Sequence, residues 1–400
     1  MVNALILFII SVLHIIMWEV ALGIICIAAV VYVFKNHDMV EKIRALYKLT
    51  NLTTQQVDEY LDTFDMSCHK KTDNIHEFIL SPKDYANKVP VKGASICSEN
   101  TAIANRILNM MQNVGNIEKM YIPPLLDKSA GLKENQVMLE KQIADYLDVN
   151  DTSKVLDIGC GTGVVAENIH SITNAEVHGF DIELSVIETA RELAYKNKDG
   201  NRLYKVWDYN EYPWPYKDNT FDGVYQIQSL TFIQTPTRFF KELKRITKPG
   251  ARIVFNETAF TDDFDADDSM HVKWITEQCP NRAGGIYMYY KYWEDLFRKA
   301  GFKYQLTKFP GSSLSLIKNQ DNWFDHVESM VKVFIGWCLV PKHVFALLTQ
   351  FRKGARSLIK LEEQAGYRHN VLFIATAPLD KPLSREAKNK HKSKATETTI

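Results

Sequence analysis

The sequence predicts an α/β fold with a doubly wound, mainly parallel sheet, and two observations carry that prediction. A short apolar segment at 154–158 has the length of a buried strand and runs straight into three glycines, Gly159, Gly161 and Gly163. A second apolar segment at 175–181 ends in an acid, and further apolar segments alternate with helical ones. Such alternation is typical of strands joined by crossover helices in a parallel sheet.

The glycines form a loop between the first strand and a helix predicted at 164–172. Glycine lets backbone N–H groups come close to a ligand, and the N-terminus of the next helix faces the same place. Asp157, just before the loop, adds a carboxylate that can accept hydrogen bonds from a cationic or hydroxylated ligand. A glycine-rich loop alone is also compatible with an ordinary tight turn, so the loop by itself does not identify the ligand.

Acids at the ends of the next two strands indicate that the ligand contains a nucleoside. Asp181 stands where a doubly wound sheet binds ribose hydroxyls, and Asp208 follows a strand at 202–207, placed to accept from an adenine amino group. The Gly-x-Gly-x-Gly spacing differs from the Gly-x-Gly-x-x-Gly loop that is usual for dinucleotides. Ile182, beside Asp181, and Gln226, beside the fourth strand, are further candidate cofactor contacts.

These motifs, in this order, resemble the class I S-adenosylmethionine-dependent methyltransferases. The later segments are a fourth strand at 219–225, a helix at 237–247, a turn at 248–250 and a fifth strand at 252–256. The resemblance implies a seven-stranded sheet, with its last, antiparallel strand at 371–377. It also implies S-adenosyl-L-methionine as the cofactor.

The rest of the chain suggests five parts, with a helix predicted at 132–147 directly before the first strand. We expect a membrane anchor at 1–34, a helical connector and cover at 35–130, the cofactor-binding core at 131–258, a substrate-binding C-terminal segment at 259–378 and a disordered basic tail at 379–400.

Composition argues against several classes of protein. Lys plus Arg and Asp plus Glu both number 48, so no overall charge favours nucleic acid as a partner. The six cysteines include no Cys-x-x-Cys pair. This argues against a zinc site or a disulfide framework and fits a reducing compartment; no metal is expected.

Residues 4–34 are almost wholly apolar, and the run exceeds the roughly 20 residues that cross a bilayer. Glu19 is unfavourable inside such a span, and an amphipathic or re-entrant segment is the alternative. Basic residues follow the run between Lys35 and Lys48, and none precedes it. By the positive-inside rule we expect a single-pass protein, of the endoplasmic reticulum membrane, with a cytosolic catalytic body.

The segment after the fifth strand resembles the sterol C-methyltransferases. That family has a Glu after this strand, then a Thr-Asp pair, an aromatic-Asp pair, a His and a Gly-Ile pair. The corresponding residues here are Glu257, Thr261-Asp262, Phe264-Asp265, His271 and Gly285-Ile286. The likeness covers roughly residues 100–378 and leaves out the expected anchor.

Two departures from the family pattern concern the carbon that is methylated. The aromatic, glycine-rich segment expected upstream in side-chain (C24) enzymes is missing at 113–124. The family's acidic Glu-Ala-Thr after the fourth strand is replaced by Gln228-Ser229-Leu230, and the amide of Gln228 cannot take a proton as a carboxylate does. The resemblance is therefore closer to the nematode type that methylates C4 of the sterol A-ring.

Methylation of an alkene would form a carbocation, which the faces of aromatic rings stabilise. The candidate substrate-binding residues are Tyr287, Tyr289, Tyr292 and Trp293. The same run is equally compatible with the buried face of a helix.

Methylation of a 3-oxosteroid enolate instead needs a base and a donor for the oxyanion. Glu257 and His271 are the candidate bases, and Tyr225 is the candidate donor. A structural role is the alternative for His271.

We therefore expect a sterol C-methyltransferase that acts on C4 of a 3-oxosteroid. A C24 side-chain methyltransferase is the first alternative, and a small-molecule N- or O-methyltransferase, such as one acting on phosphoethanolamine, is the second. The apolar segment at 323–351 argues against the second, because it suits a lid over a lipid, a membrane-contacting surface or an oligomer interface. The expected partners are the sterol, the membrane and a second copy of the chain, with no nucleic acid.

Overall fold

The computed structural model describes residues 119–197, 200–230, 233–265, 267–278, 287–317, 321–336 and 342–379, together with Thr53, Gln55, Ile79 and Leu80. The expected anchor at 1–34, nearly all of the connector and the tail from residue 380 lie outside these residues. Among the helices of the described part of the chain, none combines the length and the apolar character that a bilayer crossing requires.

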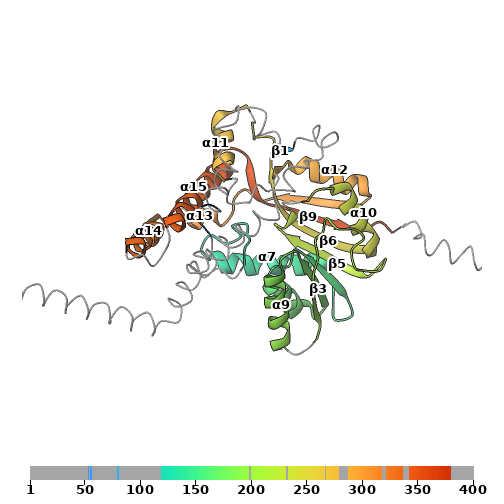
Figure 1. Ribbon diagram of the computed structural model, residues 1–400. Coiled ribbons are helices and arrows are strands. Elements are labelled where there is room, and N and C mark those ends of the chain that lie inside the picture. Colours follow the sequence, from blue (N-terminus) through green and yellow to red (C-terminus); the bar gives the residue numbers. More distant parts are fainter. Residues whose placement is uncertain are drawn as a thin grey trace, which may run out of the picture.

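In the described part, seven strands form a central sheet in the order β4-β3-β2-β5-β6-β9-β8 (Figure 1). Neighbouring strands from β4 to β6 are parallel, whereas β9 is antiparallel to both β6 and β8. The predicted doubly wound sheet with an antiparallel last strand is therefore confirmed. The strands are β2 (Lys154–Ile158), β3 (Glu176–Asp181), β4 (Arg202–Val206), β5 (Phe221–Ile227), β6 (Thr247–Phe260), β8 (Lys303–Lys308) and β9 (Tyr367–Thr376).

β6 is longer than the fifth strand expected at 252–256, and it includes the Lys-Pro-Gly segment predicted as a turn. Thr247 already pairs with Phe221, and the register shifts before Arg252 pairs with Gly223. Gly250 has a φ of 78°, a left-handed conformation that glycine adopts without strain. The Pro-Gly signal thus marks an irregularity inside a strand, which corrects the predicted turn.

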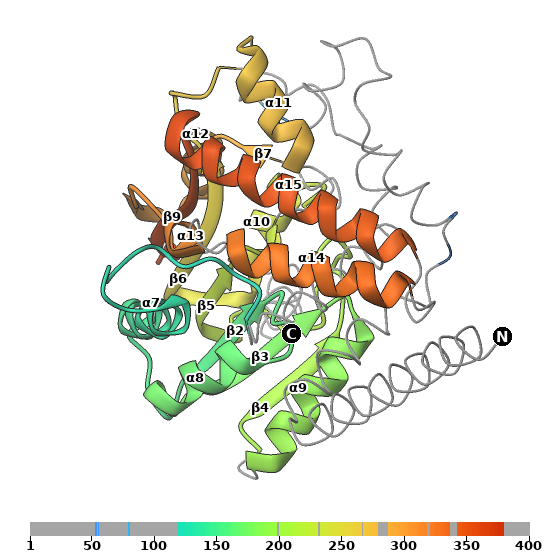
Figure 2. The same cartoon turned by 90° about the vertical axis from the view of Figure 1, so that its left-hand side faces the viewer.

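Helices cover both faces of the sheet (Figures 1 and 2). One face carries α7 (Leu132–Leu147), α8 (Val164–Thr173) and α9 (Leu184–Asn197), and the other carries α10 (Pro236–Ile246) and α12 (Tyr290–Ala300). The predicted helix before the first strand has the bounds of α7. Each layer of helices encloses its own buried apolar cluster against the sheet.

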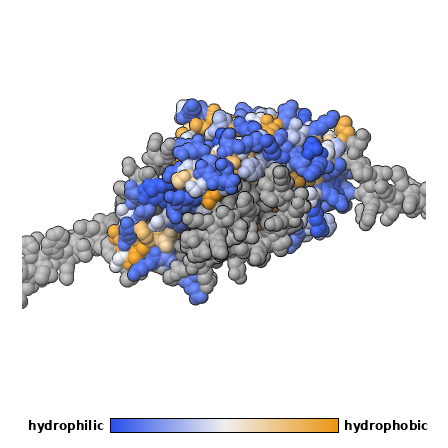
Figure 3. Space-filling view, turned by 90° about the horizontal axis from the view of Figure 1, so that it is seen from above, coloured by the Kyte–Doolittle hydropathy of each residue, from blue (hydrophilic) through white to orange (hydrophobic). Residues whose placement is uncertain are grey.

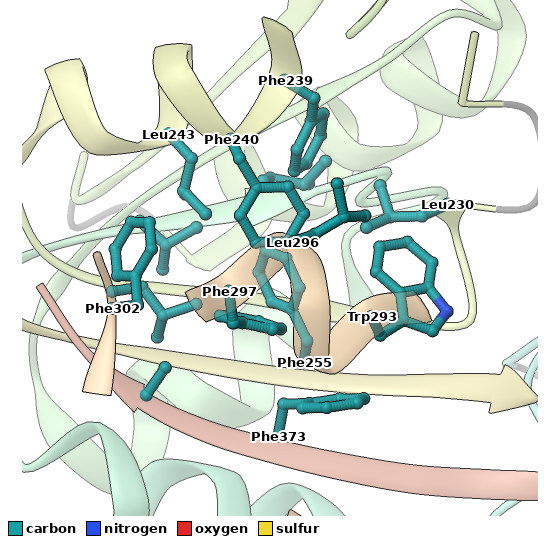
Figure 4. Close-up of a cluster of buried hydrophobic side chains, with 14 of the residues drawn as sticks. Leu230, Phe239, Phe240, Leu243, Phe255, Trp293, Leu296, Phe297, Phe302 and Phe373 are labelled. Carbon is teal, nitrogen blue, oxygen red and sulfur yellow. The ribbon is translucent and has the colours of Figure 1, made fainter. Parts of the chain in front are cut away.

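Figure 4 shows the cluster between α10, α12 and the sheet, which is rich in aromatic rings. Phe297 meets Phe240 edge-on at 4.8 Å between ring centres and stacks on Phe373 at 5.1 Å. Tyr292 and Trp293 belong to the same cluster, with Trp293 only 1% exposed. Their assignment as substrate-binding residues is therefore corrected, because the helical spacing of α12 turns both into the core.

The C-terminal segment adds helices beyond the sheet. They are α11 (Ser269–Gln278), the short α13 (Leu314–Ile317), α14 (Asp321–Gly336) and α15 (Lys342–Gln364), and a short strand β7 (Tyr287–Met288) pairs with β1 (Ile79–Leu80). α14 and α15 lie side by side, and α15 also packs on α11 and β9 (Figure 2). Val331, Leu347 and Leu348 are buried, so part of the apolar run at 323–351 stabilises these contacts. The described surface seen in Figure 3 is mainly hydrophilic.

The segment before α7 is held by a buried carboxylate. Glu140 of α7 is fully buried and accepts hydrogen bonds from Lys119 at 2.6 Å, from the hydroxyl of Tyr121 and from the amide of Asn168. Gln136, one turn earlier on α7, donates to the backbone oxygens of Lys119 and Tyr121. The approach of the chain to the sheet is thus fixed by polar contacts as well as by apolar packing.

We predict that Glu140→Gln lowers the free energy of unfolding by about 3–5 kcal/mol, because it leaves the Lys119 ammonium buried without a counter-charge. Chemical denaturation monitored by circular dichroism measures the change. The matched control is Glu192→Gln on the exposed side of α9, which should change stability little. Equal stabilities of the two variants would show that the buried ion pair does not hold this segment.

Candidate active site

The glycine loop leaves the end of β2 as the sequence predicts. Gly159, Gly161 and Gly163 all have positive φ, and Gly163 is the residue at which α8 begins. A Cβ at Gly159 would lie 2.5 Å from Cβ of Ser229, so the loop after β5 packs directly on this turn. A Cβ at Gly161 would meet no atom within 4 Å. The loop is therefore packed on one side and open at Gly161, where a ligand can approach the backbone.

Asp157, the last acid before the loop, is 3% exposed and accepts a hydrogen bond of 2.8 Å from the hydroxyl of Tyr225. Burial raises the pKa of Asp157 to about 7; the Tyr225 hydrogen bond opposes the rise, and the charges of Asp181 and Glu140 add to it. Tyr225 was predicted to hold a substrate oxyanion. Its fully buried hydroxyl instead donates to Asp157, because the two residues are paired across β2 and β5.

Asp181, at the end of β3, lies beside the open part of the loop. One carboxylate oxygen accepts from the backbone N–H of Gly161 and the other from that of Glu183, both at 3.1 Å. Burial raises the pKa of Asp181 above its ordinary value. The neighbouring Ile182 is 57% exposed and Leu184 is 53% exposed. A carboxylate beside exposed apolar side chains suits a ribose with its attached base, as predicted.

The two other predicted cofactor residues have different surroundings. Asp208 follows β4 at the same edge of the sheet and accepts a hydrogen bond from the backbone N–H of Asn210. Gln226 is fully buried; its oxygen accepts from the backbone and hydroxyl of Ser229, and its amide donates to the backbone of Asn256. Gln226 therefore supports the loop that packs on Gly159.

The candidate bases lie in separate places. Glu257 is buried in β6, where one oxygen accepts from the backbone N–H of Leu230 and the other from that of Thr258. Its carboxylate thus holds the loop after β5. His271 lies on α11, and its Nδ1 accepts a hydrogen bond from the backbone N–H of Asp265.

Aromatic residues gather just beyond the end of β6, in what we call the aromatic wall: Phe260, Phe264, Tyr289 and Tyr367. Phe260 lies 4.1 Å from Phe264, 5.3 Å from Tyr367 and 6.1 Å from Tyr289, between ring centres. Tyr289 is half-buried and directly precedes α12, while Tyr287 lies in β7. The predicted substrate-binding residue Tyr289 belongs to this wall, whereas the side chain of Tyr287 lies outside the described part of the structure.

From the sequence, Gln228 is notable only because it stands where the sterol methyltransferase pattern has an acid. In the structure its amide donates to the backbone oxygens of Ile122 at 2.8 Å and His369 at 2.9 Å, and its oxygen accepts from the backbone of Ile122. Gln228 thereby joins the loop after β5 to the segment before α7 and to β9. Local patterns could not reveal this, since the partners are 106 and 141 residues away.

Comparisons with known proteins agree with this geometry. Residues 156–255 match the family described as a methyltransferase domain. A sterol 24-C-methyltransferase of Gibberella zeae is 34% identical over 133 residues, which are 33% of this chain and 34% of that enzyme. A sterol 4-C-methyltransferase of Caenorhabditis elegans is 30% identical over 155 residues, which are 39% of this chain and 46% of that enzyme. The match thus spans less than half of the length of either enzyme.

Among solved structures, phosphoethanolamine N-methyltransferase 2 of Haemonchus contortus has the same fold. The TM-score is 0.52 at 17% identity, and the match covers 72% of this chain and 61% of that one. That structure holds phosphomonomethylethanolamine and S-adenosylhomocysteine.

The strand order and the glycine loop are those of the class I methyltransferase fold, and residues 156–255 match the methyltransferase domain. More particularly, the chain is similar to the sterol methyltransferases at 30–34% identity over the matched stretches.

We predict that the affinity for S-adenosyl-L-methionine rises as the pH rises through about 7, the pKa of Asp157. Burial raises the pKa of Asp157 above its value in the unfolded chain, so the stability that the protonated carboxyl contributes is fully present below that unfolded value and is lost as the pH rises to about 7. A cationic ligand favours the ionised form, which predominates above this pH. Isothermal titration calorimetry between about pH 6 and about pH 8 measures the effect.

At the upper pH, the Asp157→Asn variant should bind S-adenosyl-L-methionine more weakly than the wild type does. Its affinity should also lack the rise with pH that comes from ionisation of Asp157. Comparing variants with the same ligand cancels the titration of the ligand itself. Asp145→Asn on the exposed side of α7 is the control. If Asp157→Asn and the wild type have the same pH dependence, Asp157 does not contact the cationic part of the cofactor.

Proposed function

We propose that this protein is a sterol C-methyltransferase that methylates C4 of the A-ring of a 3-oxosteroid. The observation that carries the proposal is the aromatic wall at the carboxyl end of β6, together with Gln228 directly after β5, where sterol side-chain enzymes have an acid. In open α/β sheets, ligands bind at the carboxyl ends of the strands. In the wall Phe260, Phe264 and Tyr367 are buried and Tyr289 is half-buried, and an apolar, aromatic lining of this kind suits the rings of a sterol.

The methylated carbon must lose a proton, and the order of events separates the two sterol chemistries. Alkene methylation forms a cation that loses its proton last, whereas a 3-oxosteroid loses its C4 proton first, because the neighbouring ketone acidifies it. S-adenosyl-L-methionine supplies an electrophilic methyl group when it is bound. The protein's part is to position the two ligands and to exclude water. A glutamine at the position of Gln228 is compatible with the enolate chemistry.

The similarity to a nematode sterol 4-C-methyltransferase supports the same carbon, and the similarity to a fungal sterol 24-C-methyltransferase supports C24 as the runner-up. The phosphoethanolamine enzyme shares only the fold at 17% identity.

We predict that the purified protein transfers a labelled methyl group from S-adenosyl-L-methionine to C4 of a 3-oxosteroid. The measurement is a panel of 3-oxosteroids, 24-unsaturated sterols and phosphoethanolamine, with the methylated carbon located by mass spectrometry and NMR. Asp181→Ala is the control with less product at a limiting cofactor concentration, because losing its charge-assisted hydrogen bonds weakens cofactor binding by roughly 1–3 kcal/mol.

Methylation of 24-unsaturated sterols alone would replace C4 by C24 and keep the sterol assignment. Methylation of phosphoethanolamine alone would overturn it.

We also propose that residues 1–34 anchor the protein in the endoplasmic reticulum membrane with the catalytic body in the cytosol. The apolar run and the basic residues that follow it support this orientation. The described part of the chain offers a reporter, since Asn150 begins an Asn-x-Thr sequon in an exposed turn. The sequon at Asn256 is silent in either orientation, because Asn256 is fully buried in β6.

We predict that Asn150 carries no glycan in cells, so neither glycosidase treatment nor Asn150→Gln should shift the mobility of the protein on electrophoresis. The control replaces residues 1–34 with a cleavable signal peptide, which should bring the body into the lumen and add a glycan at Asn150. A glycosidase-sensitive mass in the unaltered chain would reverse the orientation.

A further inference from the structure

A buried polar cluster lies where α15 meets the start of β9. Glu362, near the end of α15, accepts a hydrogen bond of 2.7 Å from the hydroxyl of Ser312. Its other oxygen lies 3.4 Å from Nδ1 of His369 in β9. His369 is 3% exposed and Ser312 is 1% exposed. The arrangement is a carboxylate behind an imidazole, a pairing that orients histidines for proton transfer in enzymes.

His369 is connected to the cofactor loop through one short chain of contacts. Its backbone oxygen accepts from the amide of Gln228, which directly follows β5. The next residue, Ser229, donates its hydroxyl to the backbone oxygen of Ile158, the last residue before the glycine loop. His369 therefore sits at the same edge of the sheet as the cofactor loop.

The imidazole also borders the aromatic wall. The ring of His369 meets Tyr367 edge-on at 4.8 Å between ring centres, and Tyr367 contacts Phe260. Three buried polar atoms in the chain segments that meet here have no hydrogen-bond partner among the described residues: Oδ1 of Asn256, the hydroxyl of Ser313, and Nδ1 of His369, which faces Glu362 at 3.4 Å outside hydrogen-bond geometry. Unpaired buried polar atoms are rare in folded proteins and are expected where a polar ligand group completes them.

We propose that His369 is the catalytic base that removes the proton from the carbon to be methylated, and that Glu362 is its positioning residue. Nδ1 of His369 faces Glu362, which leaves Nε2 for the substrate. The C4–H bond breaks, its electron pair passes to the ketone oxygen to form the enolate, and the proton binds Nε2. The carboxylate of Glu362 then stabilises the imidazolium that forms.

The electrostatics of Glu362 agree with this role. Burial raises its pKa, but the contacts with His369 and Ser312 outweigh burial, so the pKa lies below its ordinary value. Glu362 is thus ionised at neutral pH. The other ionisable groups at this place are Tyr367, which contacts the imidazole, and Arg368, whose guanidinium donates to the backbone oxygens of Glu362 and Tyr367.

The two bases suggested by sequence are less suited to the step. Both oxygens of Glu257 accept backbone N–H groups of Leu230 and Thr258. His271 stacks on Phe264, and its Nδ1 is engaged by the backbone N–H of Asp265. A histidine held by a carboxylate accepts a proton more readily than one held by a backbone N–H group.

The inference rests on the proposed function, and the test separates the two. With a 3-oxosteroid that the wild type methylates, two rates are measured: methyl transfer, and exchange of the C4 protons with deuterium from the solvent when S-adenosylhomocysteine replaces the cofactor. The second rate reports proton removal without methyl transfer.

His369→Gln should lower both rates by about 10²–10⁴-fold, the usual contribution of a general base, with cofactor affinity nearly unchanged. His170→Gln on α8 is the matched control and should keep both rates, because this imidazole lies against the backbone oxygen of Ala175, at the opposite end of β3 from Asp181. Glu257→Gln and His271→Gln are measured in parallel as the competing bases.

The pH profile of kcat in Glu362→Gln distinguishes a positioning role from a purely structural one, because loss of a structural contact alone would not shift it. Without the carboxylate the imidazolium is less stable, so the acidic limb of the pH profile of kcat should shift to lower pH while the maximum falls. This shift decides the case if His369→Gln does not fold.

A wild type that methylates no sterol overturns the proposed function and this inference with it. A wild type that methylates a 3-oxosteroid while His369→Gln still exchanges the C4 protons at the wild-type rate overturns the inference alone. An unshifted pH profile in Glu362→Gln overturns the positioning role.

Discussion

The parallel pairing of β2 with β3 and β5 is the constraint on which the site depends. Parallel strands end at the same edge, so the pairing brings the glycine loop, Asp181 and the loop after β5 together. It also places Asp157 opposite Tyr225, which allows their hydrogen bond. A shift of one residue in this register would turn both side chains to the wrong faces of the sheet.

The same pairing concentrates buried negative charge. Burial raises the pKa of both Asp157 and Asp181; the charge of Asp181 adds to the rise at Asp157, and the charge of Glu183 adds to the rise at Asp181. A site that holds carboxylates at such a cost favours a ligand with positive charge and with hydroxyl donors. S-adenosyl-L-methionine has both, and the open backbone at Gly161 leaves room for it.

The substrate side is built differently, by segments that are distant in sequence. Gln228 joins the segment before α7 to β9, and Pro124 pairs with Ser312, whose hydroxyl binds Glu362 of α15. These contacts hold the segment before α7, the loop after β5, α15 and β9 together next to the aromatic wall. Replacing an acid by Gln228 has two consequences here: the position cannot accept a proton, and its amide can donate to two backbone oxygens at once.

The sequence by itself determined strands β2 to β5, the glycine loop with the acids at the strand ends beside it, and the cofactor, because each of these depends on residues that are neighbours in the chain. Strand length, glycine position and an acid at a strand end are local properties, and the structure reproduces them. Only the tertiary structure decided what Tyr225, Gln226, Tyr292 and Trp293 contact. The residue type in the sequence is the same whether an aromatic or amide side chain faces a ligand or the core. The pairing of His369 with Glu362, and the bonds of Gln228 to Ile122 and His369, likewise exist only once β9 inserts between β6 and β8. Contacts across more than 100 residues leave no periodic trace in a single sequence, so the cofactor half of the site was predictable and the substrate half was not.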